Sequence, residues 1–255
     1  MRIDDLDRER AEGRYVKDVF ETLGFLGLTW DEGPGDVADF GASWSQIHRM
    51  GLYRTGLEQL RGQGVLFGCN CTRAQIARAA EDGGYPGTCR DKGIALDTPG
   101  VSWRLRTDMG KELVVRTVEG VGEVRTAQGV GEVQTVEVGI EVQTTLDASM
   151  KDFVVRKKDG FPAYQLTSVI DDLHFGVDLI VRGQDLWAST LAQQYLATLL
   201  PGGQAFSEAV FHHHALLKDA DGGKLSKSAG ATSIQYLRGQ GLEREEIYGL
   251  ISPLL

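Results

Sequence analysis

The chain has 255 residues, a net charge of −9 at pH 7, and 42% apolar and 25% charged residues. This composition is ordinary for a globular protein that buries one large core or two small ones. No apolar run approaches the roughly 18–20 residues of a membrane span, and the first residues are too charged for a signal peptide. We therefore expect a cytoplasmic protein without membrane contact. The acidic balance argues against a general nucleic-acid binder but allows a local basic surface.

In chain order, the predicted elements alternate between apolar strands and amphipathic helices. Residues 2–7 predict the end of a strand followed by an acidic turn. A helix follows with Val16, Val19, Phe20 and Leu23 on one face, and we expect Gly24 to end it. Further helices are predicted at 45–61, 189–200, 234–237 and 243–250, and further strands at 101–106, 151–156 and 179–186. This alternation predicts an α/β fold with a doubly wound parallel sheet and function at the strand ends.

The most informative stretch is residues 222–230, a glycine-flanked loop that holds Lys224, Ser226, Lys227 and Ser228. Glycine on both sides allows such a loop to move. Two ammonium groups and two hydroxyls suit a strongly anionic ligand such as a triphosphate, since fixed cations stabilise a leaving pyrophosphate. The alternative is a solvated basic turn, and spacing alone does not separate the two.

Three cysteines, Cys69, Cys71 and Cys89, lie within about 20 residues. Three thiolates can close on one tetrahedral Zn²⁺ if a fourth ligand is found. The alternative is three buried or free thiols. Between this stretch and residue 151, a nine-residue repeat rich in valine and glycine runs over 120–144 and predicts short strands joined by turns.

Residues 224–228 resemble the KMSKS signature loop of class I aminoacyl-tRNA synthetases, in the Lys-Leu-Ser-Lys form of glutamyl-tRNA synthetases. Residues 152–172 and 182–186 are similar to that family's Asp-Phe-Val, Asp-Gly, Val-x-Asp-Asp and Arg-Gly-x-Asp-Leu blocks. Residues 2–7 and 28–34 match further family segments. The resemblance implies a Rossmann-like catalytic domain split over 1–60 and 151–230, an inserted acceptor-binding and zinc region at 61–150, and a helical segment at 231–255.

The resemblance also implies roles for single residues. Asp4, Tyr164 and Arg182 would bind the substrate glutamate, Lys224 and Lys227 would be catalytic, and Lys227, Ser226 and His214 would bind ATP. Other interpretations of the residues remain open at this stage. The acidic turn that holds Asp4 can cap a helix, Tyr164 can be a core residue, and Arg182 can pair with Asp185.

Cys-x-Cys-Thr-Arg followed by Tyr-x-x-x-Cys is similar to the zinc site of the glutamyl-Q tRNA(Asp) synthetase group, in which a tyrosine oxygen is the fourth ligand. The implied set here is Cys69, Cys71, Tyr85 and Cys89. Four protein ligands leave no open position, so we expect a structural zinc rather than a catalytic one.

The implied function is activation of L-glutamate by ATP with Mg²⁺, followed by transfer to queuosine of tRNA(Asp), carried out by a monomer. The alternatives are a fragment of a glutamyl-tRNA synthetase that charges tRNA(Glu) and an inactive RNA-binding paralogue. The family's His-x-Gly-His motif occurs nowhere in the 255 residues. We therefore expect that the family's first strand and helix are missing ahead of Met1.

Overall fold

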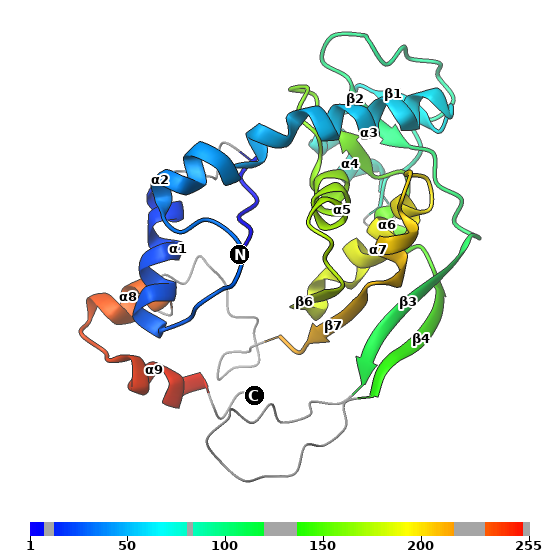
Figure 1. Cartoon of the computed structure of the whole chain (residues 1–255). Helices are drawn as coiled ribbons and strands as arrows, with labels where there is room; N and C mark the ends of the chain where they lie inside the picture. Colours follow the sequence, from blue (N-terminus) through cyan, green and yellow to red (C-terminus); the bar gives the residue numbers. More distant parts are fainter. Residues whose placement is uncertain (8–12, 81–83, 120–136, 217–232, 252–255) are drawn as a thin grey trace. The chain divides into compact units, whose positions relative to one another are not determined.

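The computed structural model describes residues 1–7, 13–80, 84–119, 137–216 and 233–251, drawn in colour in Figure 1. The chain forms two compact units. The first comprises Met1–Gly51 with Leu216–Leu255, and the second comprises Leu52–Ala215. No helix among the described residues is both long and apolar enough to cross a membrane.

Three helices organise the first unit: α1 (Gly13–Leu26), α8 (Ile234–Gly239) and α9 (Arg244–Ile251). Arg238 of α8 forms ion pairs with Asp18 and Glu21 of α1, at 3.0 and 3.1 Å. The prediction that Gly24 ends α1 is wrong. The helix continues to Leu26 because Gly27, with φ of +69°, lets the N–H of Leu28 bond the carbonyl of Leu23. This is the usual glycine-dependent helix ending.

The N-terminal acidic segment is anchored on three short helical turns: α2 (Val37–Asp39), the π-turn η1 (Phe40–Trp44) and the 3₁₀ turn η2 (Gln46–Arg49). The carboxylate of Asp5 accepts hydrogen bonds from the hydroxyl of Ser45 at 2.5 Å and the N–H of Gln46 at 2.8 Å. The side-chain oxygen of Gln46 in turn binds the N–H groups of Asp5 and Leu6. The predicted strand over residues 2–7 is therefore wrong, because a side chain takes the backbone donors that a sheet partner would use.

The second unit contains two β-sheets. The smaller sheet is antiparallel and has the order β1 (Leu66–Cys69), β2 (Ser102–Leu105), β5 (Val154–Arg156). The larger sheet has the order β4 (Glu137–Thr145), β3 (Glu112–Glu119), β7 (Val210–His214), β6 (Leu179–Gly183). Among the strands that the structure describes, only the pairs β3–β7 and β7–β6 are parallel. The predicted doubly wound parallel sheet is thus corrected to mixed sheets, because β3 and β4 pair as an antiparallel hairpin.

The third copy of the nine-residue repeat lies within β4, so its prediction as a strand is confirmed. Residues 120–136, which hold the first two copies, fall outside the described residues. In the register of the hairpin, Arg116 of β3 lies opposite Glu141 of β4, and the two side chains form an ion pair at 3.4 Å.

The helices of the second unit are α4 (Arg73–Ala79), α5 (Tyr164–His174), α6 (Trp187–Ala197) and α7 (Gln204–Glu208), and α3 (Met50–Gly62) leads into it. Two 3₁₀ turns, η3 (Ala148–Met150) and η4 (Gln184–Leu186), complete the set. Residues 189–197 of α6 are all buried, as expected for a helix covered on several faces. The core joins strands, α5 and α6 through residues such as Leu105, Val115, Val155, Leu166, Leu196 and Phe211.

Candidate functional site

A polar network lies at the carboxyl ends of the parallel strands β6 and β7. Arg182, near the end of β6, donates from Nη1 to Oε1 of Gln193 at 2.8 Å and to Oγ1 of Thr190 at 3.4 Å. Both partners belong to α6 and are fully buried. The guanidinium also lies over the ring of Phe211, 5.4 Å from its centroid. The position of Arg182 agrees with the general rule that open α/β sheets bind ligands at the carboxyl ends of their strands.

His213 of β7 completes this network. Its Nε2 lies 2.8 Å from Oγ1 of Thr190. The hydroxyl proton of Thr190 is directed at the carbonyl of Leu186, so we assign the proton of this contact to His213. Burial, and then the positive charge of Arg182, lower the pKa of His213 from 6.5 to about 4. The imidazole is therefore neutral at pH 7 and adds no second positive charge beside Arg182.

The sequence prediction named His214 and missed His213, Thr190 and Gln193. His214 is exposed, and its Nδ1 lies 2.9 Å from the carbonyl oxygen of Ala215. Alternation along the strand places His213 on the same side as Phe211, and their rings stack at 6.0 Å. That alternation is a signal that could have selected His213. The signal for Thr190 and Gln193 is weaker: polar residues within an otherwise apolar helix.

Tyr164 is the first residue of α5 and is 42% exposed. The alternative that it is a core tyrosine is therefore wrong. Its neighbour Gln165 is buried and donates from Nε2 to the hydroxyl of Ser189 at 3.1 Å, which ties the start of α5 to α6. Oε1 of Gln165 is buried without a hydrogen-bond partner among the described residues. Tyr164 thus presents its side chain to solvent from a fixed helix end.

Asp4 belongs to the first unit. Its Oδ1 accepts hydrogen bonds from Nε of Arg2 at 3.0 Å and from Nε2 of Gln46 at 3.3 Å. The neighbouring Asp5 accepts the N–H of Gln46, the first residue of η2, but the N-cap of this turn is Ser45. Lys224, Ser226 and Lys227 lie outside the described residues, so their roles stay predictions.

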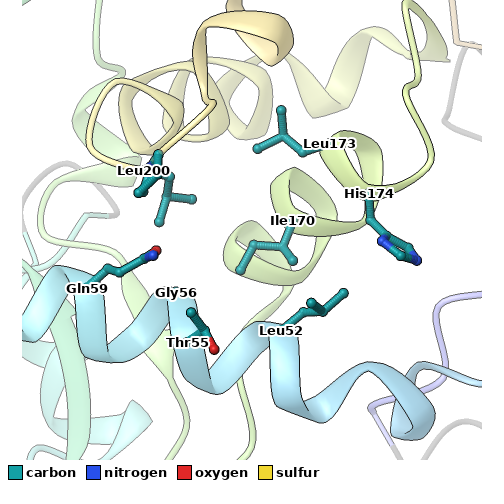
Figure 2. A pocket seen from close by; sticks show the side chains of 9 residues that line it. Leu52, Thr55, Gly56, Gln59, Ile170, Leu173, His174 and Leu200 are labelled. Atoms are coloured by element: carbon teal, nitrogen blue, oxygen red, sulfur yellow. The ribbon is translucent and has the colours of Figure 1, made fainter.

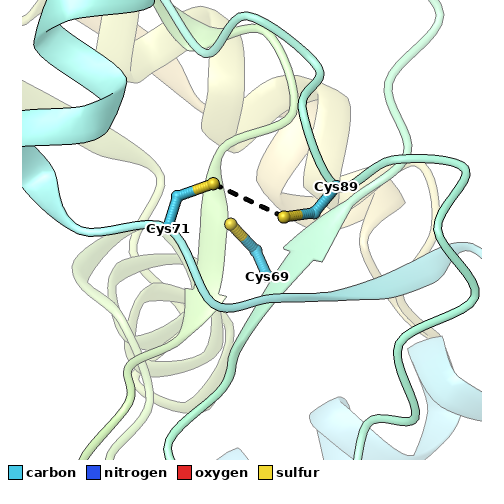
Figure 3. A group of neighbouring side chains, drawn as sticks. All are labelled: Cys69, Cys71 and Cys89. Atoms are coloured by element: carbon cyan, nitrogen blue, oxygen red, sulfur yellow. Dashed lines mark hydrogen bonds between the residues drawn. The ribbon is translucent and has the colours of Figure 1, made fainter.

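The three cysteines form a thiol cluster at the end of β1, shown in Figure 3. The three sulfur atoms lie within 4.8 Å of one another, and those of Cys71 and Cys89 are 3.4 Å apart. Sulfur atoms around a tetrahedral Zn²⁺, with bonds of about 2.3 Å, are separated by about 3.8 Å. The hydroxyl oxygen of Tyr85 lies 3.4 Å from the sulfur of Cys69 and accepts the N–H of Cys89 at 2.8 Å. The three sulfur atoms and the tyrosine oxygen are compatible, in number, type and spacing, with the ligands of one zinc ion.

The side chains of the thiol cluster, and their burial, change one another's pKa values. For Cys69, burial raises the thiol pKa, but hydrogen bonds from Tyr85, the backbone at Cys71 and Arg104 outweigh it and lower the pKa to about 7. Burial, followed by the neighbouring thiols, raises the pKa of Cys71 to about 11. Burial also raises the pKa of Tyr85. A bound dication would favour the thiolate form of all three cysteines.

A separate, mostly apolar pocket of about 270 Å³ lies between α3, α5 and the turn at Leu200 and Pro201 (Figure 2). Leu52 and Gly56 of α3 face Ile170 and Leu173 of α5 across it. Asp4, Tyr164, Arg182, His214 and the four proposed zinc ligands, which are the described members of the predicted sites, do not line this pocket. It is therefore separate from the candidate site in the described part of the chain.

A family model described as tRNA synthetases class I (E and Q), catalytic domain, matches residues 1–252. The chain belongs to this family and is a ligase of the aminoacyl-tRNA synthetase type. The resemblance drawn from the signature loop is therefore confirmed at the level of the family.

Among curated relatives, the glutamyl-Q tRNA(Asp) synthetase of Parasynechococcus marenigrum is 34% identical over 99% of this chain and 70% of its own length. The protein of the same name from Chromobacterium violaceum is 37% identical over 92% and 68%. A glutamate–tRNA ligase of Dehalococcoides mccartyi is 30% identical, but the chain spans only 48% of it. The glutamate–tRNA synthetase structure from Elizabethkingia anophelis matches 90% of this chain and 46% of its own, with a TM-score of 0.56 and 21% identity. That structural similarity supports the assignment of the fold.

Proposed function

We propose that the chain activates glutamate with ATP and Mg²⁺ and transfers it to an RNA acceptor, queuosine of tRNA(Asp). The observation that carries the proposal is the position of Arg182 at the carboxyl end of β6, oriented by Gln193 and Thr190. A guanidinium held in this way can bind a carboxylate through two parallel hydrogen bonds. Tyr164, exposed at the start of α5, is the partner we propose for a directional hydrogen bond to the same substrate.

In this proposal Asp4 binds the amino group of glutamate, and His214, Ser226 and Lys227 bind ATP. The substrate carboxylate attacks the α-phosphate in line, and glutamyl-adenylate and pyrophosphate form. Lys227, with Lys224, stabilises the charge on the departing pyrophosphate, and Mg²⁺ supplies further positive charge. His213 remains neutral and keeps Thr190 against Arg182 without competing for the anion.

We further propose that Cys69, Cys71, Tyr85 and Cys89 hold one structural zinc ion. The closeness of the three sulfur atoms and the tyrosine oxygen supports this assignment. Such a site stabilises the loop between β1 and β2 and takes no part in the chemistry, because four protein ligands leave no position open.

The identity of the RNA that receives glutamate is the more specific part of the proposal. The chain spans 70% and 68% of two relatives named glutamyl-Q tRNA(Asp) synthetase, and these names favour queuosine of tRNA(Asp). The second candidate, glutamyl transfer to tRNA(Glu), is favoured by the 30% identical glutamate–tRNA ligase and by the fold of the solved synthetases. Direct comparison of [¹⁴C]glutamate transfer to queuosine-containing tRNA(Asp), queuosine-free tRNA(Asp) and tRNA(Glu) separates the two.

The first test is glutamate-dependent ATP–pyrophosphate exchange without tRNA, on the wild type, Lys227→Ala and Arg182→Met. We expect exchange by the wild type, a loss of 10²–10³-fold in kcat for Lys227→Ala, and a KM for glutamate about 100-fold higher for Arg182→Met. The matched control is Lys17→Ala, whose lysine is 69% exposed on α1 and should leave exchange unchanged. A folded wild type without exchange in the presence or absence of tRNA contradicts the proposal and favours the inactive RNA-binding paralogue.

A further inference from the structure

Arg104, in the middle of the small antiparallel sheet, is a buried cation. It is 8% exposed, and its Nε is buried without a hydrogen-bond partner in the described part of the chain. Its Nη1 donates to the backbone carbonyl of Asp152 at 2.8 Å. Arg104 forms no ion pair with a carboxylate of the described residues, although a buried guanidinium normally requires an anionic partner. Its surroundings must therefore supply negative charge in another form.

The strand register directs Arg104 toward the thiol cluster. In the β1–β2 ladder, Phe67 pairs with Arg104 and Cys69 pairs with Ser102, whose hydroxyl bonds the carbonyl of Cys69 at 3.1 Å. The guanidinium carbon of Arg104 lies 3.8 Å from the ring centroid of Tyr85. Cys69 lies two residues along β1 from Phe67, and therefore on the same face of the sheet as Arg104. The cation thus contacts Tyr85 directly and shares this sheet face with Cys69.

The charges of such a cluster do not cancel among the metal and its four ligands alone. Three thiolates and a neutral phenol around a divalent metal leave one negative charge in excess. In a buried site this excess is costly unless a cation lies nearby. The guanidinium of Arg104, stacked on the ring of Tyr85 and on the same sheet face as Cys69, supplies a charge of the required sign. Outer groups of this kind orient metal ligands and tune metal affinity.

We propose that Arg104 is the counter-cation and positioning residue of the thiol cluster. It offsets the surplus negative charge of the three thiolates around a divalent metal, and it holds the ring of Tyr85 against Cys69 and Cys89. This inference rests on the proposed zinc site and goes beyond its four ligands.

The test compares Arg104→Met, which keeps the apolar stem, with Arg104→Lys, which keeps the charge. The matched control is Arg156→Met, because Arg156 of the adjacent strand β5 lies 4.8 Å from the ring centroid of Trp103 and makes the same kind of contact away from the thiols. Each full-length, zinc-loaded protein is mixed with excess 4-(2-pyridylazo)resorcinol, and the rate of zinc release is followed. Melting temperatures are measured with and without zinc.

We expect Arg104→Met to release zinc at least about 10-fold faster than the wild type, Arg104→Lys to recover most of the difference, and Arg156→Met to match the wild type. The stabilisation by zinc should shrink in Arg104→Met alone. Release from Arg104→Met at the wild-type rate, or equal losses of melting temperature with and without zinc, would overturn the proposal. A wild type that binds no zinc would refute the zinc site and with it this role, whereas zinc binding unaffected by Arg104→Met would refute only the role of Arg104. If Arg104→Met does not fold, the Arg104→Lys variant decides the question. A folded Arg104→Lys protein that does not retain zinc would argue against a role of the positive charge in holding the metal.

Discussion

Arg182 and Arg104 are both arginines that lie against an aromatic ring in the second unit, but their settings differ. Arg182 ends a parallel strand, where an amide and a hydroxyl orient it, and the nearby His213 is neutral at pH 7. Arg104 lies in the middle of an antiparallel sheet, on the side of the thiol cluster, and contacts the ring of Tyr85. We propose that the first setting keeps a positive charge for a bound substrate, and that the second uses a positive charge to offset the thiolates of a metal site. In these proposals the same side chain serves recognition at one sheet and stability at the other.

The largest expected effect concerns stability at the thiol cluster. Cys89→Ser should lose the stoichiometric zinc and destabilise the fold by about 3 kcal/mol or more, which corresponds to roughly 10 °C in melting temperature. Calorimetry together with metal analysis measures both. Wild type stripped of metal by a chelator is the control and should melt near the variant. A variant that melts with the wild type and keeps one zinc per chain would show that the cluster is not a structural metal site.

Removal of one hydroxyl, from Tyr85 at the thiol cluster or from Tyr164 at the proposed substrate site, tests the same difference between the two regions. Tyr85 is 4% exposed and Tyr164 is 42% exposed. Tyr85→Phe should accelerate zinc release about 10-fold and lower the melting temperature by a few degrees, because the oxygen facing Cys69 is lost. Tyr164→Phe should leave the melting temperature within about 2 °C but raise the KM for glutamate about 10-fold, the cost of about one hydrogen bond.

The two tyrosine variants act as controls for each other. An equal loss of stability in both would remove the distinction between a structural and a recognition region. A normal KM for glutamate in Tyr164→Phe would exclude the phenol from substrate binding.

The smallest expected effect is the pH dependence that comes from His213. Its folded-state pKa of about 4 lies below the ordinary value of 6.5, so the unfolded chain binds an extra proton between these values. The corresponding stability is fully present above pH 6.5 and is lost as the pH falls toward 4. After allowance for partial solvent exposure, we expect about 1 kcal/mol. Urea unfolding at pH 7 and pH 5 should show this loss in the wild type and not in His213→Gln.

His213→Gln retains a donor for Thr190, so its stability at pH 7 should stay near that of the wild type. Equal pH dependence in both proteins would contradict a depressed pKa at His213 and would weaken the argument that Arg182 carries the only positive charge of the network at neutral pH.

Several local features could be predicted because they depend on neighbours in the sequence. The helix predicted at 45–61 carries Met50, Tyr53, Leu57 and Leu60 at helical spacing, and of these the last three are buried in α3 while Met50 is half-buried. The helix predicted at 234–237 is present as α8, and the hydroxyl of Ser233 caps it by accepting the N–H of Tyr236 at 3.1 Å. The family itself followed from short motifs, and the family model confirms it. Caps, periodicity and motifs are short-range properties that adjacent residues suffice to determine.

The direction of strand pairing and the partners of each functional side chain required the tertiary structure. An isolated strand carries no information on whether its neighbour runs parallel, so the mixed order β4-β3-β7-β6 could not be obtained from alternation alone. The same holds for the contact of His213 with Thr190, and for Gln193 as the residue that orients Arg182 from 11 positions away. The sequence by itself determined which chemical groups the chain contains and to which family the chain belongs. Only the fold decided which of them meet, because burial and hydrogen bonding between distant segments depend on how strands and helices pack.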